Sequence, residues 1–146
     1  GVFCCSKAGH NLAMWSLYAD KHKGVCFVFD SNLDKAFKDT ADVKYSNNPR
    51  TFNLYDGFKP RNILATKYST WSFENEIRIF KANAGTYKFT ANALKEIRLG
   101  LNAFYDRTNA TRVRMLVDII QRRYPTVLLK QASRIRNNYG LKFSEY

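Results

Sequence analysis

The most informative stretch of the sequence is Thr66-Lys67-Tyr68-Ser69-Thr70-Trp71-Ser72-Phe73-Glu74-Asn75-Glu76-Ile77-Arg78-Ile79-Phe80. In an extended strand, successive side chains point to opposite faces of the sheet. If this stretch is a strand, its apolar side chains share one face, and Glu74, Glu76 and Arg78 form a row on the other. The strand is expected to be most regular over residues 76–81. Two carboxylates and one guanidinium in a single row make this segment the candidate functional site.

The charged row allows two interpretations. On a solvated face, Arg78 neutralises Glu76 and the row has no further consequence. In a cleft, the two like charges push their pKa values apart and Arg78 lowers one of them, which leaves one ionised carboxylate and one proton donor. The spacing alone favours the solvated face, so the rest of the chain must decide between them.

The charge balance of the chain is strongly basic. Its 146 residues include 24 Lys and Arg against 12 Asp and Glu, for a net charge of +12. Residues 86–146 hold 12 of the basic and 4 of the acidic side chains, or +8 of that total. This excess predicts a polyanionic partner such as nucleic acid, a nucleotide or an acidic protein, although many bacterial domains are simply basic and soluble. The length predicts a single domain over residues 1–146.

Cys4, Cys5 and Cys26 do not form the pattern of a disulfide framework or a metal site. Their number is odd, two are adjacent and no Cys-x-x-Cys pair occurs, so we expect reduced thiols in a cytoplasmic protein without metal. No signal peptide and no apolar run of membrane-spanning length is present, so no membrane partner is expected. The chain begins at Gly1 without Met, which predicts that it lacks an N-terminal portion of a longer protein.

The hydrophobic pattern predicts an α+β fold with a mixed, mostly antiparallel sheet and two or three helices packed on it. A first helix begins after Asn11 and ends in a left-handed cap at Gly24. A long helix is capped by Thr108 or Asn109 and stops at Pro125. Strands are expected at residues 2–6, 25–29, 42–46, 76–81, 86–89, 95–100, 126–129 and 140–143. Of these, 2–6 is expected to be buried, 25–29 central, 42–46 at an edge, and 86–89 the hairpin partner of 76–81.

Three segments of the chain carry a family resemblance. They are Cys5-Ser6 with Met14-Trp15-Ser16-Leu17-Tyr18-Ala19-Asp20-Lys21-His22-Lys23-Gly24-Val25-Cys26 and Phe29-Asp30; Lys67 with Trp71-Ser72-Phe73-Glu74-Asn75-Glu76-Ile77-Arg78; and Ile97-Arg98-Leu99-Gly100. Together they resemble a bacterial family known as domain of unknown function 2971, over nearly the whole chain. The sequence departs from that family in lacking a further N-terminal part and in a shorter region between Pro49 and Lys67.

The layout of this family is similar to that of the ADP-ribosyltransferase superfamily, which includes DNA-modifying toxins. Those enzymes place a Glu-x-Glu or a single Glu beside the nicotinamide end of NAD, and Glu74-x-Glu76 matches in type and spacing. The resemblance implies that Glu76 steadies the ribose as it gains oxocarbenium character, that Glu74 activates an acceptor, and that Arg78 holds the carboxylates. The first hypothesis is therefore an NAD-using, ADP-ribosyltransferase-like domain of a bacterial defence or toxin-type system.

Six further residues are candidate ligand contacts: Ser6, Trp15, Tyr18, His22, Lys67 and Trp71. His22 could contact a phosphate or ribose, or be only a cation at a helix C-terminus. Lys67 could meet a diphosphate as a point charge, or be a surface lysine. Trp15 and Tyr18 could stack on adenine or nicotinamide, but core positions are favoured, and Trp71 is expected to be a core anchor that fixes the carboxylate strand. The serine could bond a ligand, but a simple turn hydroxyl is favoured.

The basic C-terminal half supports a second hypothesis, a non-catalytic module that binds nucleic acid or a partner protein. Its candidate phosphate contacts are Arg107, Arg112, Arg114, Arg122 and Arg123, with tyrosines interspersed that could stack on bases. An ordinary solvated helix face is the alternative. A third hypothesis is a structural domain in which the carboxylate row only closes a hairpin by salt bridges.

Overall fold

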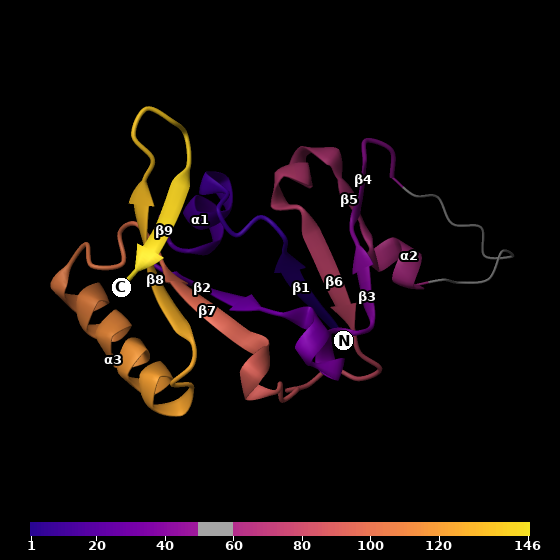
Figure 1. Cartoon of the computed structure of the whole chain (residues 1–146). Helices are drawn as coiled ribbons and strands as arrows, with labels where there is room; N and C mark the ends of the chain where they lie inside the picture. The colour runs from indigo at the N-terminus through magenta and orange to yellow at the C-terminus, as the bar shows by residue number, and fades with distance from the viewer. Residues whose placement is uncertain (50–59) are drawn as a thin grey trace, which may run out of the picture. The chain divides into compact units, whose positions relative to one another are not determined.

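The computed structural model of the chain describes residues 1–49 and 60–146 (Figure 1). The contacts between these residues divide the chain into two compact units, each built from two separate segments. Unit 1 comprises Gly1–Ala8 and Phe37–Thr86, and unit 2 comprises Gly9–Ala36 and Tyr87–Tyr146. Both units combine strands with helices, which confirms the α+β class. A single domain over the whole chain stays a prediction.

Unit 1 is organised around strand β6. The antiparallel sheet has the order β1-β6-β3, with β1 at Val2–Ser6, β6 at Glu76–Phe80 and β3 at Thr40–Asp42. A second, parallel pair joins β4 (Lys44–Ser46) to β5 (Thr66–Tyr68), and the short helix α2 (Pro60–Leu64) leads into β5. Because β6 is hydrogen-bonded along both edges, the residues that it carries are held in a fixed register.

The informative stretch of the sequence is not one continuous strand. It forms β5, then the 3-10 helix η4 (Ser69–Glu74), and then β6. Asn75 ends η4 in the left-handed conformation, with φ 45°, which asparagine tolerates better than most residues. The strand predicted for residues 76–81 is thus confirmed over Glu76–Phe80, whereas Glu74 lies on a helical turn before it.

Unit 2 contains a mixed sheet in the order β2-β7-β8-β9. Its strands are β2 (Val25–Phe29), β7 (Leu94–Leu99), β8 (Leu128–Arg134) and β9 (Leu141–Glu145). The β7–β8 pair is parallel and the other two pairs are antiparallel. Since parallel neighbours need a long crossover, the helix α3 (Arg107–Arg123) makes that connection between β7 and β8.

Two clusters of buried side chains cover the sheet of unit 2. The larger one packs α3 through Val113, Val117 and Ile120 against Ile97 and Leu99 of β7. The smaller one packs Trp15 of α1 (Leu12–Tyr18) against Ala132 of β8 and Leu141 of β9. Alternate residues of β8 therefore face different clusters, as the two-residue period of a strand requires.

The predicted N-cap is correct for α1 and wrong for α3. Asn11 caps α1 as predicted, because its side-chain oxygen accepts from the backbone N–H of Ala13 at 2.9 Å. The long helix is capped by Asp106, whose carboxylate accepts from the backbone N–H of Asn109 at 2.8 Å. The prediction of Thr108 or Asn109 as the cap was therefore wrong, since the helix begins at Arg107.

Several strand predictions require correction. The strand over residues 2–6 forms but is exposed over its first three residues, because it lies at a sheet edge. The strand over residues 25–29 is also an edge strand rather than a central one. Residues 42–46 divide between β3 and β4, which belong to different sheets. Residues 86–89 form no strand, since β1 and β3 already occupy both edges of β6.

The first helix ends earlier than predicted, in a left-handed turn. Asp20, Lys21 and His22 have φ values of 43°, 54° and 68°, so three consecutive non-glycine residues adopt a conformation that L-residues rarely enter. Gly24 is not the left-handed cap that the sequence predicted. Asn102 holds the turn from outside: its backbone N–H donates to the carbonyl of His22 at 2.9 Å and its side-chain amide to that of Lys21 at 3.0 Å.

Gly100 is required for this turn because a side chain there would collide with backbone. A Cβ atom at position 100 would lie 2.1 Å from the carbonyl oxygen of His22 and 3.0 Å from that of Gly24. We expect Gly100→Ala to destabilise the protein by about 3 kcal/mol, the upper end of the usual penalty for overpacking. The free energy of unfolding in urea measures the effect.

Gly9→Ala is the matched control for this substitution. The closest atom to a Cβ at position 9 is the guanidinium nitrogen Nη1 of Arg98 at 3.0 Å, which is the movable end of a side chain. Its effect should stay within about 0.5 kcal/mol. Equal urea midpoints for the two variants would contradict the role assigned to Gly100.

Candidate functional site

The ammonium group of Lys67 lies between two buried carboxylates in unit 1. It forms a close ion pair with Oε2 of Glu74 and lies 3.4 Å from Oε2 of Glu76. The side chain of Glu74 is only 3% exposed and that of Glu76 is 7% exposed. The two carboxylates are therefore not on a solvated face and do not close a hairpin. A surface salt bridge does not describe their arrangement.

The backbone on either side of the carboxylates is fixed by hydrogen bonds from neighbouring elements. The hydroxyl of Ser6 donates to the carbonyl oxygen of Glu74 at 2.6 Å. The backbone N–H of Glu76 donates to the phenol oxygen of Tyr45 at 2.9 Å. Between them, the left-handed Asn75 turns the chain so that both acidic side chains reach Lys67. Ser6 thus contributes to the position of the carboxylates.

Arg78 holds Glu76 in a two-point contact. Its Nε donates to Oε1 of Glu76 at 2.8 Å and its Nη2 donates to Oε2 at 3.1 Å, while Nη1 donates to the carbonyl of Leu64. Burial disfavours ionisation of Glu76, but hydrogen bonds from Arg78 and Cys4 and the charges of Arg78 and Lys67 outweigh it and lower the pKa of Glu76 to about 2. Glu76 is therefore a carboxylate at every physiological pH.

Trp71 and Cys4 complete the surroundings of the cluster. The ammonium of Lys67 lies 5.1 Å from the centroid of the Trp71 ring, a cation–π distance. Trp71 is 38% exposed, so it is not the buried anchor that the sequence favoured. Partial burial, together with the hydrogen bond to Glu76 and its charge, raises the pKa of the Cys4 thiol, which keeps Cys4 protonated beside the carboxylate.

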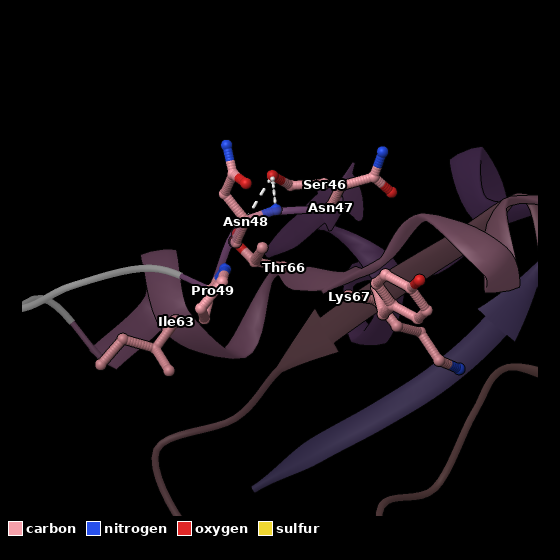
Figure 2. Close-up of a pocket in the computed structure, with 8 residues that line it drawn as sticks. Ser46, Asn47, Asn48, Pro49, Ile63, Thr66 and Lys67 are labelled. Carbon is pink, nitrogen blue, oxygen red and sulfur yellow. Dashed lines mark hydrogen bonds between the residues drawn. The ribbon is translucent and has the colours of Figure 1, made fainter.

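A hollow of about 340 Å³ lies beside β5 (Figure 2). It is lined by Ser46, Asn47, Asn48, Pro49, Ile63, Thr66, Lys67 and Tyr68. Figure 2 shows the amino group of Lys67 pointing away from Asn48 and Ile63, which agrees with the alternation of side chains along β5. Lys67 thus lines the hollow, whereas neither Glu74 nor Glu76 does. No pattern in the sequence analysis predicted this hollow.

Three of the predicted ligand contacts belong to unit 2. Trp15 is buried and its indole N–H donates to the carbonyl of Gly9 at 3.1 Å, as the favoured core position predicted. Tyr18 is exposed. His22 lies in the left-handed turn rather than at a helix end, and burial followed by the charge of Arg134 lowers its pKa. The structure thus brings Ser6, Lys67 and Trp71 together with the carboxylates within unit 1, and Trp15 and His22 together within unit 2.

Unit 2 contains a second cluster that the sequence interpretation missed. Oε2 of Glu96 accepts from Nε of Arg98 at 2.9 Å, and its Oε1 accepts from Nζ of Lys130 at 2.7 Å. Burial disfavours its charge, but hydrogen bonds from Lys130 and Arg98 outweigh it and lower the pKa of Glu96. The signal was a repeated tripeptide, since Glu-Ile-Arg occurs at residues 76–78 and again at residues 96–98.

The two clusters share a plan and differ in one carboxylate. In each, a strand carries a Glu that is bonded by the Arg two residues later and by a Lys from elsewhere in the same unit. In unit 1 the lysine also meets a second acid, Glu74, whereas no second acid within ion-pair distance of Lys130 is found in the described part of the chain. Glu74 is thus what distinguishes the candidate site from a simple ion-pair cluster.

The arginines proposed as phosphate contacts all lie on α3 and are all exposed: Arg107, Arg112, Arg114, Arg122 and Arg123. Among residues 1–49 and 60–146, no three His, Cys, Asp or Glu side chains are grouped so that they could hold a metal ion. No helix of those residues is long and apolar enough to cross a membrane.

Comparison with known proteins yields one match. Residues 14–79 match the family model described as "Protein of unknown function (DUF2971)". The resemblance to DUF2971 is thereby confirmed over this segment. The match runs from α1 to β6 and includes His22, Lys67 and both acids of the candidate site. No curated protein and no solved structure matches the chain.

The depressed pKa of Glu76 can be measured directly. Because its folded-state pKa is about 2 and its ordinary value is 4.5, the carboxylate stabilises the fold above about pH 4.5, and this contribution is lost as the pH falls toward 2. A carboxyl ¹³C NMR titration should therefore give one glutamate a midpoint near pH 2, and that signal should be absent in Glu76→Gln. A midpoint near 4.5 for the assigned signal would contradict the arrangement with Arg78 and Lys67.

Proposed function

We propose that this protein is an ADP-ribosyltransferase-like domain that uses NAD, with Glu74 and Glu76 at the reacting end of the site. The proposal is supported above all by the ammonium of Lys67 shared between two buried carboxylates. Buried charges are costly to desolvate, and one carboxylate is enough to pair a lysine, as Glu96 and Lys130 illustrate in unit 2. The presence of the second acid, Glu74, therefore requires another explanation. A reaction that develops positive charge in its transition state would provide one.

The chemistry of NAD is complementary to this cluster. NAD has a positive nicotinamide ring and a negative diphosphate. On binding, the two acids could pair with the ring and Lys67 with the diphosphate, in place of their pairing with one another. The carboxylates would face the nicotinamide-ribose end, and the ammonium of Lys67 would meet a phosphate oxygen as a point charge. Such an exchange keeps every buried charge paired before and after binding, which limits its energetic cost.

Each side chain has a role in transfer of ADP-ribose. When the bond between nicotinamide and ribose breaks, nicotinamide leaves with the bonding electrons and the ribose becomes positively charged. Glu76, ionised with a pKa of about 2, would stabilise that charge, and Arg78 would hold it in position. Glu74 would accept the proton of the acceptor as it bonds to the ribose carbon. The half-exposed ring of Trp71, already beside a cation, would offer a stacking face for nicotinamide.

Consumption of labelled NAD by the purified protein, with cell extract as the source of acceptor, tests this function. Glu76→Gln removes the charge while keeping the shape, and should lower the rate about 10²- to 10³-fold, the usual loss for a group that stabilises transition-state charge. Glu96→Gln is the matched control, because it removes the corresponding carboxylate of the other Glu-Ile-Arg segment and should leave the rate within about twofold. Absence of NAD loss, or equal losses of rate in the two variants, would exclude the proposed function.

A further inference from the structure

The exposed face of α3 carries two separate rows of arginine. At about 100° per residue, Arg107, Arg114 and Arg122 fall within about 80° of one another around the helix axis. Arg112 and Arg123 fall within about 20° of each other, on the far side of the same exposed face. The opposite face of α3 is buried against the sheet of unit 2, so both rows point outward.

An apolar strip separates the two rows. Met115 and Ile119 lie between them around the helix and are 60% and 53% exposed. Neither side chain belongs to the buried clusters, which use Val113, Val117 and Ile120 instead. The exposed face therefore has the order basic, apolar, basic across its width. Because the two residues are four apart, they are neighbours on the helix surface and make one continuous apolar strip between the arginines.

The arginines of α3 are not neutralised within the described part of the chain. None of the five has a carboxylate within 4 Å among residues 1–49 and 60–146, and Asp118 is the single acidic residue of the helix. Arg122 donates from Nε to the backbone carbonyl of Asp118, and the guanidinium of Arg114 lies 5.9 Å from the centroid of Phe104. Those contacts orient the two guanidinium groups and leave their charge uncompensated.

We infer that this face binds duplex DNA, with α3 lying in the major groove. The major groove is about 12 Å wide and accepts a helix, whose diameter with side chains is about 10–12 Å. Two rows of arginine on either side of the helix match the two phosphate backbones that border the groove. The strip of Met115 and Ile119 would then face the base edges, where thymine methyl groups offer apolar contact. The major groove of duplex RNA is too deep and narrow for this arrangement.

This inference is independent of the NAD proposal, since it concerns a different surface of the chain. An anionic membrane is the other polyanionic surface that a basic helix can meet. A membrane-binding helix buries a broad apolar face in the lipid, whereas the broad apolar face of α3 already packs on the sheet and only a narrow strip remains. The two-row arrangement therefore favours DNA.

The first test measures salt dependence and charge. Fluorescence anisotropy of a labelled 20-base-pair duplex with the whole protein should show weakening of about 250-fold between 50 and 200 mM NaCl, as expected for four to five neutralised phosphates. The triple variant Arg107→Gln, Arg114→Gln, Arg122→Gln should lower the slope of log K against log salt by about 3. The matched control, Lys35→Gln, Lys88→Gln, Lys95→Gln, removes the same charge from exposed positions of unit 2 outside α3 and should change the slope by less than 1.

The second test addresses the apolar strip. Met115→Gln with Ile119→Gln should weaken binding about fivefold or more at 100 mM NaCl and leave the salt slope unchanged, because the strip touches bases and not phosphates. Vesicles containing phosphatidylserine serve as the competing surface. Equal effects of the arginine and lysine variants, a slope shallower than 1, or tighter binding to the vesicles than to the duplex would each overturn the inference. Circular dichroism confirms that the variants, all at exposed positions, remain folded.

Discussion

The arrangement of unit 1 depends on the ammonium of Lys67 being held between Glu74 and Glu76. Lys67 lies on β5, Glu74 ends η4 and Glu76 begins β6, so one cation ties three consecutive elements together. With Arg78, the cluster contains two positive and two negative charges and is neutral overall. Removing one member would leave a buried charge without its partner, which typically costs about 3–5 kcal/mol. The elements around the site are therefore fixed by electrostatics as much as by apolar packing.

Comparison of the two Glu-Ile-Arg segments separates what is structural from what needs a functional explanation. In both segments, the glutamate carboxylate accepts hydrogen bonds from the arginine two residues later and from a lysine of the same unit. That shared part is explained by strand alternation, since residues two apart lie on the same face. Glu74 is the addition in unit 1, and the left-handed Asn75 links it to Glu76 at the end of η4. Backbone conformations of this kind are retained where the surrounding structure requires them, often at functional sites.

Local signals in the sequence predicted the elements that depend on local contacts. The Asn11 cap, the strand over Glu76–Phe80 and the long helix that ends before Pro125 follow from side-chain chemistry and periodicity alone. The convergence of Glu74 and Glu76 was also predicted, although by the wrong route, because alternation along one strand was assumed where a helical turn intervenes. The cap of α3 and the turn before Glu76 were local errors, whereas others concern contacts distant in sequence. Gly24 was assigned the left-handed cap, but the turn is held by Gly100 and Asn102, about 80 residues away.

The charges of the Lys67 cluster are balanced, whereas those on the exposed face of α3 are not. The ion pairs around Lys67 neutralise one another, so the cluster exerts little field beyond its own surroundings. The arginines of α3 have no such partners among the described residues, so their charge remains uncompensated there. A helix needs only its buried stripe of Val113, Val117 and Ile120 to pack on the sheet, and any polar residue would serve on the other face. Unpaired arginine in two rows is thus not required by the fold, and the duplex DNA inferred above would supply the opposite charge.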